Sequence, residues 1–473
     1  MGAKPLAAAL EKTLDAIDAG AQAAQERLFT LLRMKSVSTD PAYAEEVAAT
    51  ARWLADDLAS MGFDASVRQT SGHPMVVAHD HGAGPDTPHV LFYGHYDVQP
   101  VDPIELWEGD PFEPVVLGEG DDARIRARGA SDDKGQLMTF LEACRGFRAA
   151  TGALPCRVSV LLEGEEESGS PSLEPFLREA ADELRADVAL VCDTNMWNAT
   201  TPAITVALRG MASDEVTIHA ASRDLHSGYY GGAAQNPIHV LSRILAGLHD
   251  ETGRVTLEGF YDGVPEVPDE VRQRWNALGF SGADFLAEVG LSVPSGEQDR
   301  TVLEQTWTRP TAEVNGITGG YTGEGFKTVI PAKASAKVSF RLVGTQDPAR
   351  VAAAFRKHVE AGLPADCRAE FHAHGRGPAT QLDWDMPQLT KAADALSDEW
   401  GTNAAIIGGG GSIPIVGDFK RMLGMDSLLI GFALADDAIH SPNEKYQLRS
   451  FAKGARSWAR VLTALAEGNG AEG

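Results

Sequence analysis

Cysteine is scarce in this chain of 473 residues, and the four that occur, Cys144, Cys156, Cys192 and Cys367, form no close pair in the sequence. Disulfide bonds are typical of proteins in oxidising compartments. The lack of close pairs therefore predicts a reducing compartment, and we expect the protein to be cytoplasmic.

Excess basic charge and long apolar runs are also missing. Lys and Arg number 41 against 67 Asp and Glu, so the formal net charge is −26. Phosphate repels such an acidic chain, so we expect no binding to nucleic acid or to an anionic membrane. No apolar run reaches transmembrane length, and Glu11, Asp15 and Asp18 interrupt the place where a signal peptide would need an apolar core. The glycines at 408–411 are not followed by Gly-Lys-Ser/Thr, which argues against a phosphate-binding loop.

Four short apolar runs indicate strands that are buried on both faces of a sheet. They are rich in Val, Leu and Ile, and stretches with helical periodicity, such as 44–61 and 136–148, separate them. This alternation predicts an α/β fold. The runs lie at 89–93, 158–162, 188–191 and 427–432.

The pattern changes between residues 209 and 377. A strand at 214–220, a helix at 237–248, strands at 314–317 and 334–342, a helix at 348–359 and a strand at 369–374 follow one another. The order βαββαβ is typical of a ferredoxin-like α+β unit. Because the alternation of the first part then resumes, we predict an inserted domain at 209–377, between two parts of one α/β domain at 1–208 and 378–473. The segment 251–310 is mixed and has no assignable pattern.

Histidines and carboxylates stand at or beyond the ends of the four predicted strands. In open α/β sheets, ligands bind beyond the carboxyl ends of the strands. A single histidine, or the acidic run at 165–167, would more often be an ordinary polar surface, so the prediction rests on the whole set. One cleft would collect His95, Asp97, Asp132, Glu166, Glu167, Asp193 and His440, with Asp132 leading into a predicted helix.

Two histidines with several carboxylates are typical ligands of zinc or a similar divalent metal. The set holds more ligands than one tetrahedral ion uses, and two ions about 3.5–4 Å apart would use most of them. Asp97 stands two residues after His95, so on an extended chain both side chains would point the same way. A carboxylate there could accept the second ring N–H of the histidine and fix its tautomer.

Nine stretches give the chain a resemblance to a known family. They are 93–97 (YGHYD), 131–135 (SDDKG), 163–169 (EGEEESG), 191–193 (VCD), 224–228 (DLHSG), 327–331 (KTVIP), 340–343 (FRLV), 411–414 (GSIP) and 440–444 (HSPNE). Together they resemble the dinuclear zinc peptidase family of glutamate carboxypeptidase, aminoacylase and carnosine dipeptidase, and within it the cytosolic non-specific dipeptidase branch. The resemblance covers nearly the whole chain. It implies a mixed-sheet zinc-peptidase catalytic domain, an inserted ferredoxin-like lid and dimerisation domain, and a homodimer.

The resemblance also implies how the metal ligands are shared. Asp132 would bridge two divalent ions, which are expected to be zinc, with manganese or cobalt as other choices. His95 and Asp193 would complete the site of one ion, and Glu167 and His440 would complete the site of the other.

The remaining roles concern catalysis and substrate binding. Glu166 would be the general base that takes a proton from water and passes it to the leaving amine. Asp97 would orient His95, and His226 would stabilise the oxyanion, in related dimers from the neighbouring subunit. Arg341 would hold the terminal carboxylate of the substrate by paired hydrogen bonds. The same pocket would be lined by His374 and Ser412.

Three other functions stay open. A deacylase of N-acyl amino acids would use the same metal site with a different pocket on the amine side. A metal-binding scaffold without catalysis would not need Glu166. A glycosidase with paired carboxylates would leave the histidines and Asp132 without a task. The dipeptidase branch usually has Arg-Glu before Gly-Gly-Ser-Ile-Pro, where this chain has Gly408 and Gly409, so no side chain stands there to bind a free amine.

Overall fold

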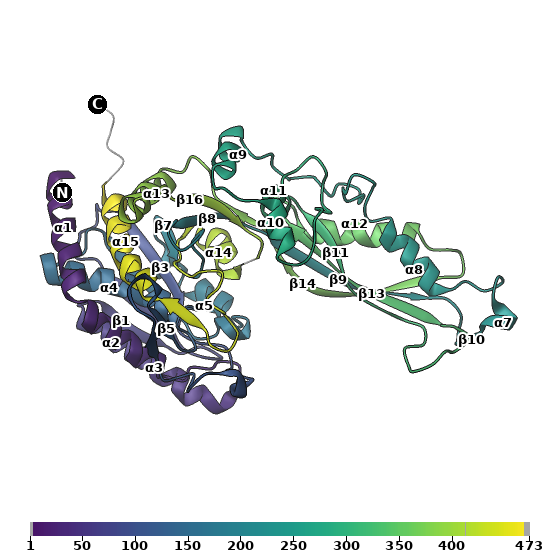
Figure 1. The fold of residues 1–473 in the computed structure, drawn as a ribbon, viewed down its shortest axis with the longest axis horizontal. Helices are drawn as coiled ribbons and strands as arrows, with labels where there is room; N and C mark the ends of the chain where they lie inside the picture. Colours follow the sequence, from purple (N-terminus) through teal and green to yellow (C-terminus); the bar gives the residue numbers. More distant parts are fainter. Residues whose placement is uncertain (1–2, 412, 468–473) are drawn as a thin grey trace. The chain divides into compact units, whose positions relative to one another are not determined.

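The computed structural model describes residues 3–411 and 413–467 and divides into two compact units (Figure 1). The first unit comprises Met1–Thr205, Leu382–Ile407 and Asp418–Gly473, and the second comprises Val206–Gln381 and Gly408–Gly417. In chain order, the second unit is therefore inserted into the first. Ser412 lies outside the described residues.

A nine-stranded mixed sheet contains the main strands of the first unit, whereas β15 and the last residues of β8 and β16 belong to the second unit. Its order is β1-β2-β6-β3-β7-β17-β8-β15, with β16 beside β8. The central strands β6, β3, β7 and β17 are parallel, whereas β1, β2 and β8 pair antiparallel with their neighbours. The strands are β1 (Asp64–Arg68), β2 (Met75–Asp80), β3 (His89–His95), β6 (Arg157–Glu163), β7 (Val188–Val191), β8 (Ala203–Leu208), β15 (Thr380–Gln381), β16 (Ala405–Gly409) and β17 (Ser427–Leu429).

Helices pack against this sheet through a core of aromatic rings. Phe92 of β3 stacks on Phe140 of α4 with ring centroids 3.8 Å apart, and Trp458 of α15 meets both rings edge-on. A left-handed glycine, Gly152 (φ 76°), ends α4. The helices of this unit are α1 (Ala3–Ala19), α2 (Ala21–Leu32), α3 (Ala44–Ser60), α4 (Lys134–Thr151), α5 (Leu173–Glu179), α6 (Ala181–Leu184), α13 (Pro387–Trp400) and α15 (Leu448–Ala466); α14 (Pro414–Asp418) spans the unit boundary.

A small second sheet and a short turn complete the parts of the first unit that carry the site. The sheet has the order β18-β5-β4, with β4 (Val115–Leu117), β5 (Arg124–Arg126) and β18 (Lys445–Gln447). It brings the segment before α15 next to β5. A 3₁₀ turn, η4 (Glu166–Ser168), follows β6, and a π-helical turn, η5 (Phe419–Leu423), precedes β17.

Four antiparallel strands form the sheet of the second unit, in the order β11-β13-β9-β14. They are β9 (Gly210–His219), β11 (Thr311–Gly319), β13 (Lys333–Leu342) and β14 (Arg368–Gly377). Helices α8 (Pro237–Ala246) and α12 (Pro348–Ala361) pack on one face, and each begins at a proline after a side-chain cap, Asn236 or Asp347 (Figure 1). Chain order and sheet order together are those of the predicted ferredoxin-like unit.

The segment 251–310, which had no assignable pattern, contains three short helices. They are α9 (Asp269–Asn276), α10 (Gly282–Ala287) and α11 (Val302–Trp307). A capping box holds the start of α11, because Thr301 accepts from the backbone N–H of Glu304 and the Glu304 carboxylate accepts in return. The second unit is completed by β10 (Leu225–His226), α7 (Ser227–Tyr230) and β12 (Val329–Ile330).

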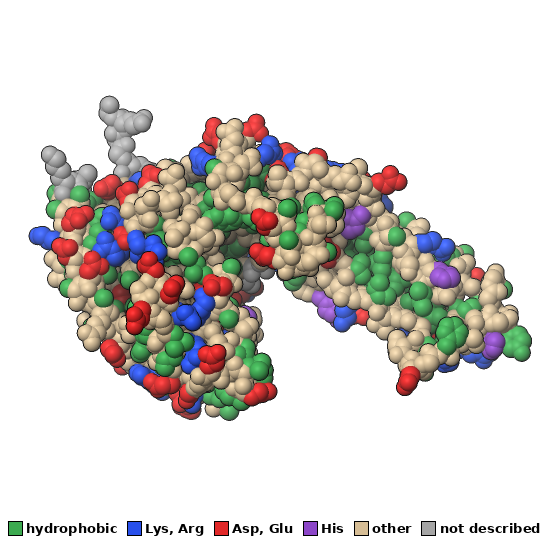
Figure 2. All heavy atoms as spheres, viewed as in Figure 1, with side chains coloured by type: hydrophobic (Ala, Val, Ile, Leu, Met, Phe, Trp, Pro, Cys, Tyr) green, Lys and Arg blue, Asp and Glu red, His purple; other side chains and the backbone are tan. Residues whose placement is uncertain are grey.

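Charged side chains of both signs are interspersed over the visible face of the first unit (Figure 2). Within residues 3–411 and 413–467, no helix combines the length and the apolar character needed to span a bilayer.

Candidate metal centre

The central parallel strands of the first unit bring the predicted site residues to one edge of the sheet. Since β3, β6 and β7 run in the same direction, their carboxyl ends meet at that edge. His95 is the last residue of β3, Glu166 and Glu167 form the turn after β6, and Asp193 follows β7 by two residues. The order of elements thus explains why residues far apart in the sequence lie together.

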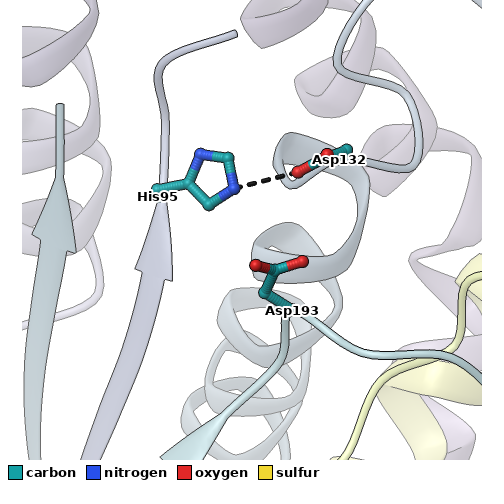
Figure 3. Close-up of side chains that lie close together, drawn as sticks. All are labelled: His95, Asp132 and Asp193. Atoms are coloured by element: carbon teal, nitrogen blue, oxygen red, sulfur yellow. Dashed lines mark hydrogen bonds and ion pairs between the residues drawn. The ribbon is translucent and has the colours of Figure 1, made fainter. Parts of the chain in front are cut away.

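Three side chains form the first group of possible metal ligands (Figure 3). One ligand atom from each of His95, Asp132 and Asp193 lies within 4.8 Å of the other two. The His95 ring is fully buried, and its Nε2 is 2.9 Å from Oδ1 of Asp132. Asp132 comes from the loop before α4, so this group joins two strand ends and a helix start.

The second group contains Asp132 again, together with Glu167 and His440. Nε2 of His440 is 2.9 Å from Oδ2 of Asp132 and 3.2 Å from Oε2 of Glu167. Asp132 therefore faces one histidine with each of its two carboxylate oxygens. This is the arrangement expected of a carboxylate shared between two neighbouring sites.

His440 is held in an unusual backbone conformation. Its φ is 61°, in the left-handed region that costs a residue other than glycine about 1–2 kcal/mol. Asn443 anchors the turn, because its side chain accepts from the N–H of Glu108 and donates to the carbonyl of Leu106. Strain of this kind persists where the surroundings hold a functional side chain in place.

The donor set fits divalent metal ions. Two imidazole nitrogens and several carboxylate oxygens are ligands of zinc and of similar cations. The protein alone leaves a concentration of negative charge here, since burial and the neighbouring Asp132 raise the pKa of Asp193 well above its usual value. Hydrogen bonds to Asp132 and Glu167 likewise raise the pKa of His440 to about 10. A bound cation would replace these protons as the balancing charge.

Glu166 lies beside this group of ligands but belongs to neither donor set. Burial raises the pKa of its carboxyl, and the nearby Glu167 and Asp132 raise it further, although His95 opposes them. A carboxylate with a raised pKa that stands next to a metal ligand is suited to accept a proton near neutral pH.

Asp97 connects the histidine to the acidic turn. Its carboxylate accepts from the backbone N–H of Glu166 at 3.2 Å and of Glu167 at 3.0 Å. Nδ1 of His95 lies 3.2 Å from the main-chain oxygen of Asp97 and 3.4 Å from its Oδ1. The side chains of His95 and Asp97 thus lie together as the sequence predicted, and the main-chain oxygen of Asp97 also meets the ring.

Two residues near the centre were not assigned a role from the sequence. Gln99 donates from Nε2 to Oε2 of Glu167 at 2.8 Å. Glu444, fully buried, accepts at Oε1 from the backbone N–H of Ser131 and Asp132, at 2.9 and 3.0 Å. Its Oε2 accepts from the N–H of Gly129 and from the buried Arg128. Glu444 is the last residue of the HSPNE stretch, so that motif was the signal that could have found it.

The other predicted residues belong to the second unit. His226 is exposed, and its Nδ1 accepts from the backbone N–H of Gly228 at 3.0 Å. Arg341 lies in β13, partly exposed, and the exposed His374 of β14 is 3.6 Å from Glu215. Their roles therefore stay predictions.

Known proteins resemble this chain over most of its length. The profile of the peptidase family M20/M25/M40 matches residues 91–464. The Cys-Gly metallodipeptidase DUG1 of Saccharomyces cerevisiae is 29% identical over 460 residues, which cover 93% of this chain and 95% of that protein. The Beta-Ala-His dipeptidase of Homo sapiens is 28% identical over 404 residues, 83% of this chain and 78% of that protein.

A solved structure supports the same relationship. The M20 family metallo-carboxypeptidase Sso-CP2 from Sulfolobus solfataricus superimposes with a TM-score of 0.76 at 30% identity, covering 94% of this chain and 99% of that one. These similarities confirm the predicted family and the predicted fold class. The chain is a member of the peptidase family M20/M25/M40 and, with it, a metallopeptidase.

Proposed function

We propose that this enzyme hydrolyses dipeptides or related small amides with a free carboxylate, at a centre of two divalent metal ions. The observation that carries the proposal is the position of Asp132, which belongs to both donor groups and faces a histidine with each oxygen. The dipeptidase names of the relatives in yeast and in humans support the substrate class. An unaltered Glu166 beside the ligands argues against a scaffold without catalysis.

The predicted ligands would divide between the two ions. His95 and Asp193 would hold one ion, Glu167 and His440 the other, and Asp132 both. Zinc is the expected metal, with manganese or cobalt as other choices. When bound, such a pair of ions lowers the pKa of water and polarises the scissile carbonyl.

The protein's own groups would carry the proton and the substrate. Glu166 would accept a proton from the attacking water and donate it to the leaving amine. Asp97 would orient the His95 ring and fix its position relative to the turn after β6. His226 would stabilise the oxyanion, and Arg341 would pair with the substrate carboxylate. His374 and Ser412 complete the proposed substrate pocket.

We also propose a homodimer in the cytoplasm, with residues 209–377 as lid and dimerisation domain between 1–208 and 378–473. The described cysteines are all free, which suits a reducing compartment. In this arrangement His226 would act on the site of the neighbouring subunit.

Deacylation of N-acyl amino acids is the second candidate, and one contact favours it. A Cβ at Gly408 would lie 2.5 Å from Cβ of Trp307, closer than real Cβ atoms come. A side chain at position 408 is therefore excluded while Trp307 keeps its place, and Gly409, where the branch usually has its acid, carries no side chain either. We expect N-acetyl dipeptides to be cleaved better than C-terminal amides.

The test is hydrolysis of a dipeptide, its N-acetyl form and its C-terminal amide before and after exhaustive chelation. Chelation should abolish activity, and zinc, manganese or cobalt should restore it, with two ions bound per chain. Losing the charge-assisted contact to the carboxylate should lower kcat/KM for the amide about 10- to 150-fold. Activity that survives verified metal removal would overturn the metal mechanism. An amide cleaved as well as the parent would overturn the assigned carboxylate contact.

A further inference from the structure

Two arginines lie on the same face of the sheet in the second unit. Arg341 of β13 pairs with Met211 of β9, and Arg209 precedes Met211 by two residues. Arg209 stands one residue before β9, and the alternation of that strand, continued by one residue, puts it on the side of Arg341. The charge of Arg341 acts on Arg209, so the two side chains are neighbours. The flanking Phe340 and Leu342 belong to the core beneath the helices. The arginines therefore occupy the face that α8 and α12 leave open.

Neither arginine is neutralised by an acid. Within residues 3–411 and 413–467, no carboxylate comes within 4.0 Å of a nitrogen of Arg209 or Arg341. Other arginines of this unit are paired: Arg309 with Glu297 at 2.9 Å, and Arg356 with Asp214 at 2.9 Å. Glu313 of β11 influences Arg209 only through space. Two unpaired guanidinium groups side by side repel each other, unless an anion binds between them.

Burial makes this arrangement more costly. Arg209 is only partly accessible, and burial, together with the charge of Arg341, lowers the pKa of Arg209 to about 10. A perturbed charge of this kind is typical of a functional site.

Hydrogen bonds to the glycine loop at 408–411 use only part of the donor capacity of Arg209. Its backbone N–H donates to the carbonyl of Gly411 and its Nε to the carbonyl of Gly410, both at 3.1 Å. The two terminal nitrogens donate no hydrogen bond to the residues that the structure describes. The loop therefore uses one side of the guanidinium, and the fork that matches a carboxylate stays available.

We propose that Arg209 and Arg341 together bind a dicarboxylate, so that the preferred substrate carries Asp or Glu at its C-terminal position. The proposal rests on the proposed function, in which Arg341 holds the terminal carboxylate, and it assigns the side-chain carboxylate to Arg209. The pair would supply local positive charge in a chain of net charge −26, which otherwise repels a dianion.

Ala-Glu and Ala-Gln separate charge from shape, because their side chains are nearly isosteric. Wild-type kcat/KM should favour Ala-Glu about 10- to 150-fold. Arg209→Gln should bring that ratio close to one, and Arg209→Lys should restore part of it. Arg376→Gln is the matched control: Arg376 lies on the same sheet but pairs with Asp214, so its loss should leave the ratio unchanged. A wild-type ratio near one, or an unchanged ratio in Arg209→Gln, would overturn the proposal.

Binding gives a second readout that needs no turnover. Calorimetric titration of the Glu166→Gln protein with each peptide should show tighter binding of Ala-Glu, and the added Arg209→Gln change should remove the difference. Equal affinities in the Glu166→Gln protein would contradict the dicarboxylate site. If wild-type protein binds Ala-Glu preferentially but hydrolyses neither peptide, the proposed function fails and the dicarboxylate site stands.

Discussion

The side chain of Glu166 stands one residue before Glu167, outside both donor groups and mostly out of contact with water. Glu166→Gln keeps the shape and removes the ability to accept a proton. We expect kcat to fall by about 10²- to 10⁴-fold with the metal content unchanged. Elemental analysis and steady-state kinetics on the same preparation check this. Asp132→Ala is the contrasting variant, because it should lose metal as well as activity.

The pH dependence of the wild-type rate tests the same role of Glu166. Burial raises the pKa of Glu166, and a general base works only when it is deprotonated. The rate should therefore fall on the acidic side, as pH drops through the raised pKa. Near-normal turnover in Glu166→Gln would assign the base to another group.

Glu444 accepts hydrogen bonds from the loop that carries Asp132, but it belongs to neither group of possible metal ligands. Glu444→Gln keeps one acceptor oxygen and replaces the other with an amide NH2 group, whose hydrogens would face N–H donors, so the loop would lose part of its anchor. We expect metal affinity to fall about 10- to 100-fold, as it does when other residues that hold metal ligands in place by hydrogen bonds are changed. Competition with a coloured chelator measures this. The control is Glu108→Gln, because Glu108 is exposed and pairs with Arg126. An unchanged metal affinity in this variant would show that the loss of any one carboxylate does not by itself weaken metal binding.

The candidate metal ligands were easier to predict from the sequence than the residues that hold them in place. His95 ends one strand and Asp193 follows another, and both strands were predictable from apolar runs. Their ends share an edge of the sheet because the strands are parallel. Glu444 acts through backbone groups about three hundred positions away, as its 2.9 Å bond to Ser131 shows. Such a contact depends on tertiary packing and leaves no local periodicity to detect.

Between elements, Glu399 joins α13 to α15. Burial disfavours its charge, but hydrogen bonds from Arg456 and Arg460, both at 2.8 Å, outweigh it and lower the pKa of Glu399 below its usual 4.5. A lowered folded-state pKa means stability that is present above 4.5 and lost as pH falls through the folded value. Glu399→Gln should therefore cost about 1.5–3 kcal/mol at pH 7.

Thermal unfolding at several pH values measures this cost, and the difference from wild type should shrink below pH 4.5. Glu174→Gln is the control, because the pair of Glu174 with Arg178 is exposed and such pairs contribute about 1 kcal/mol or less. A difference that is constant with pH would show that the Glu399 charge is not what stabilises the packing.

Helices and strands were predictable from the sequence where their packing imposes one regular pattern of apolar residues. The run at 188–191 became β7 with the same bounds, because all four of its residues are buried. The run at 427–432 became the shorter β17, Ser427–Leu429. A Cβ at Gly431 would lie 1.8 Å from the carbonyl oxygen of Thr194, so the chain passes too close to its neighbour there for a regular ladder. The helices within 251–310 are short, and only α10 and α11 begin at a side-chain cap. Their apolar residues give too few turns for a period to be recognised.

For the whole molecule, the proposed action of His226 across a dimer is testable by mixing. His226→Ala should lower kcat more than it weakens substrate binding, because an oxyanion contact strengthens in the transition state. His226→Ala and Glu166→Gln should each be nearly inactive alone. If His226 serves the neighbouring subunit, a mixed dimer regains one complete site, up to about half of one dimer's activity. No recovery after proven subunit exchange would place His226 in its own subunit's site.

The pairing of Asp132 with His440, and of its loop with Glu444, has a consequence for protein synthesis. Chains emerge from the ribosome with the N-terminal part first. The second donor group and the anchor of the Asp132 loop both wait for the segment around residue 440. A nascent chain that already exposes His95, Asp132 and Glu166 therefore cannot assemble the complete centre. On the proposed mechanism, the enzyme therefore stays inert until the segment around residue 440 has been translated and has joined the part that carries Asp132.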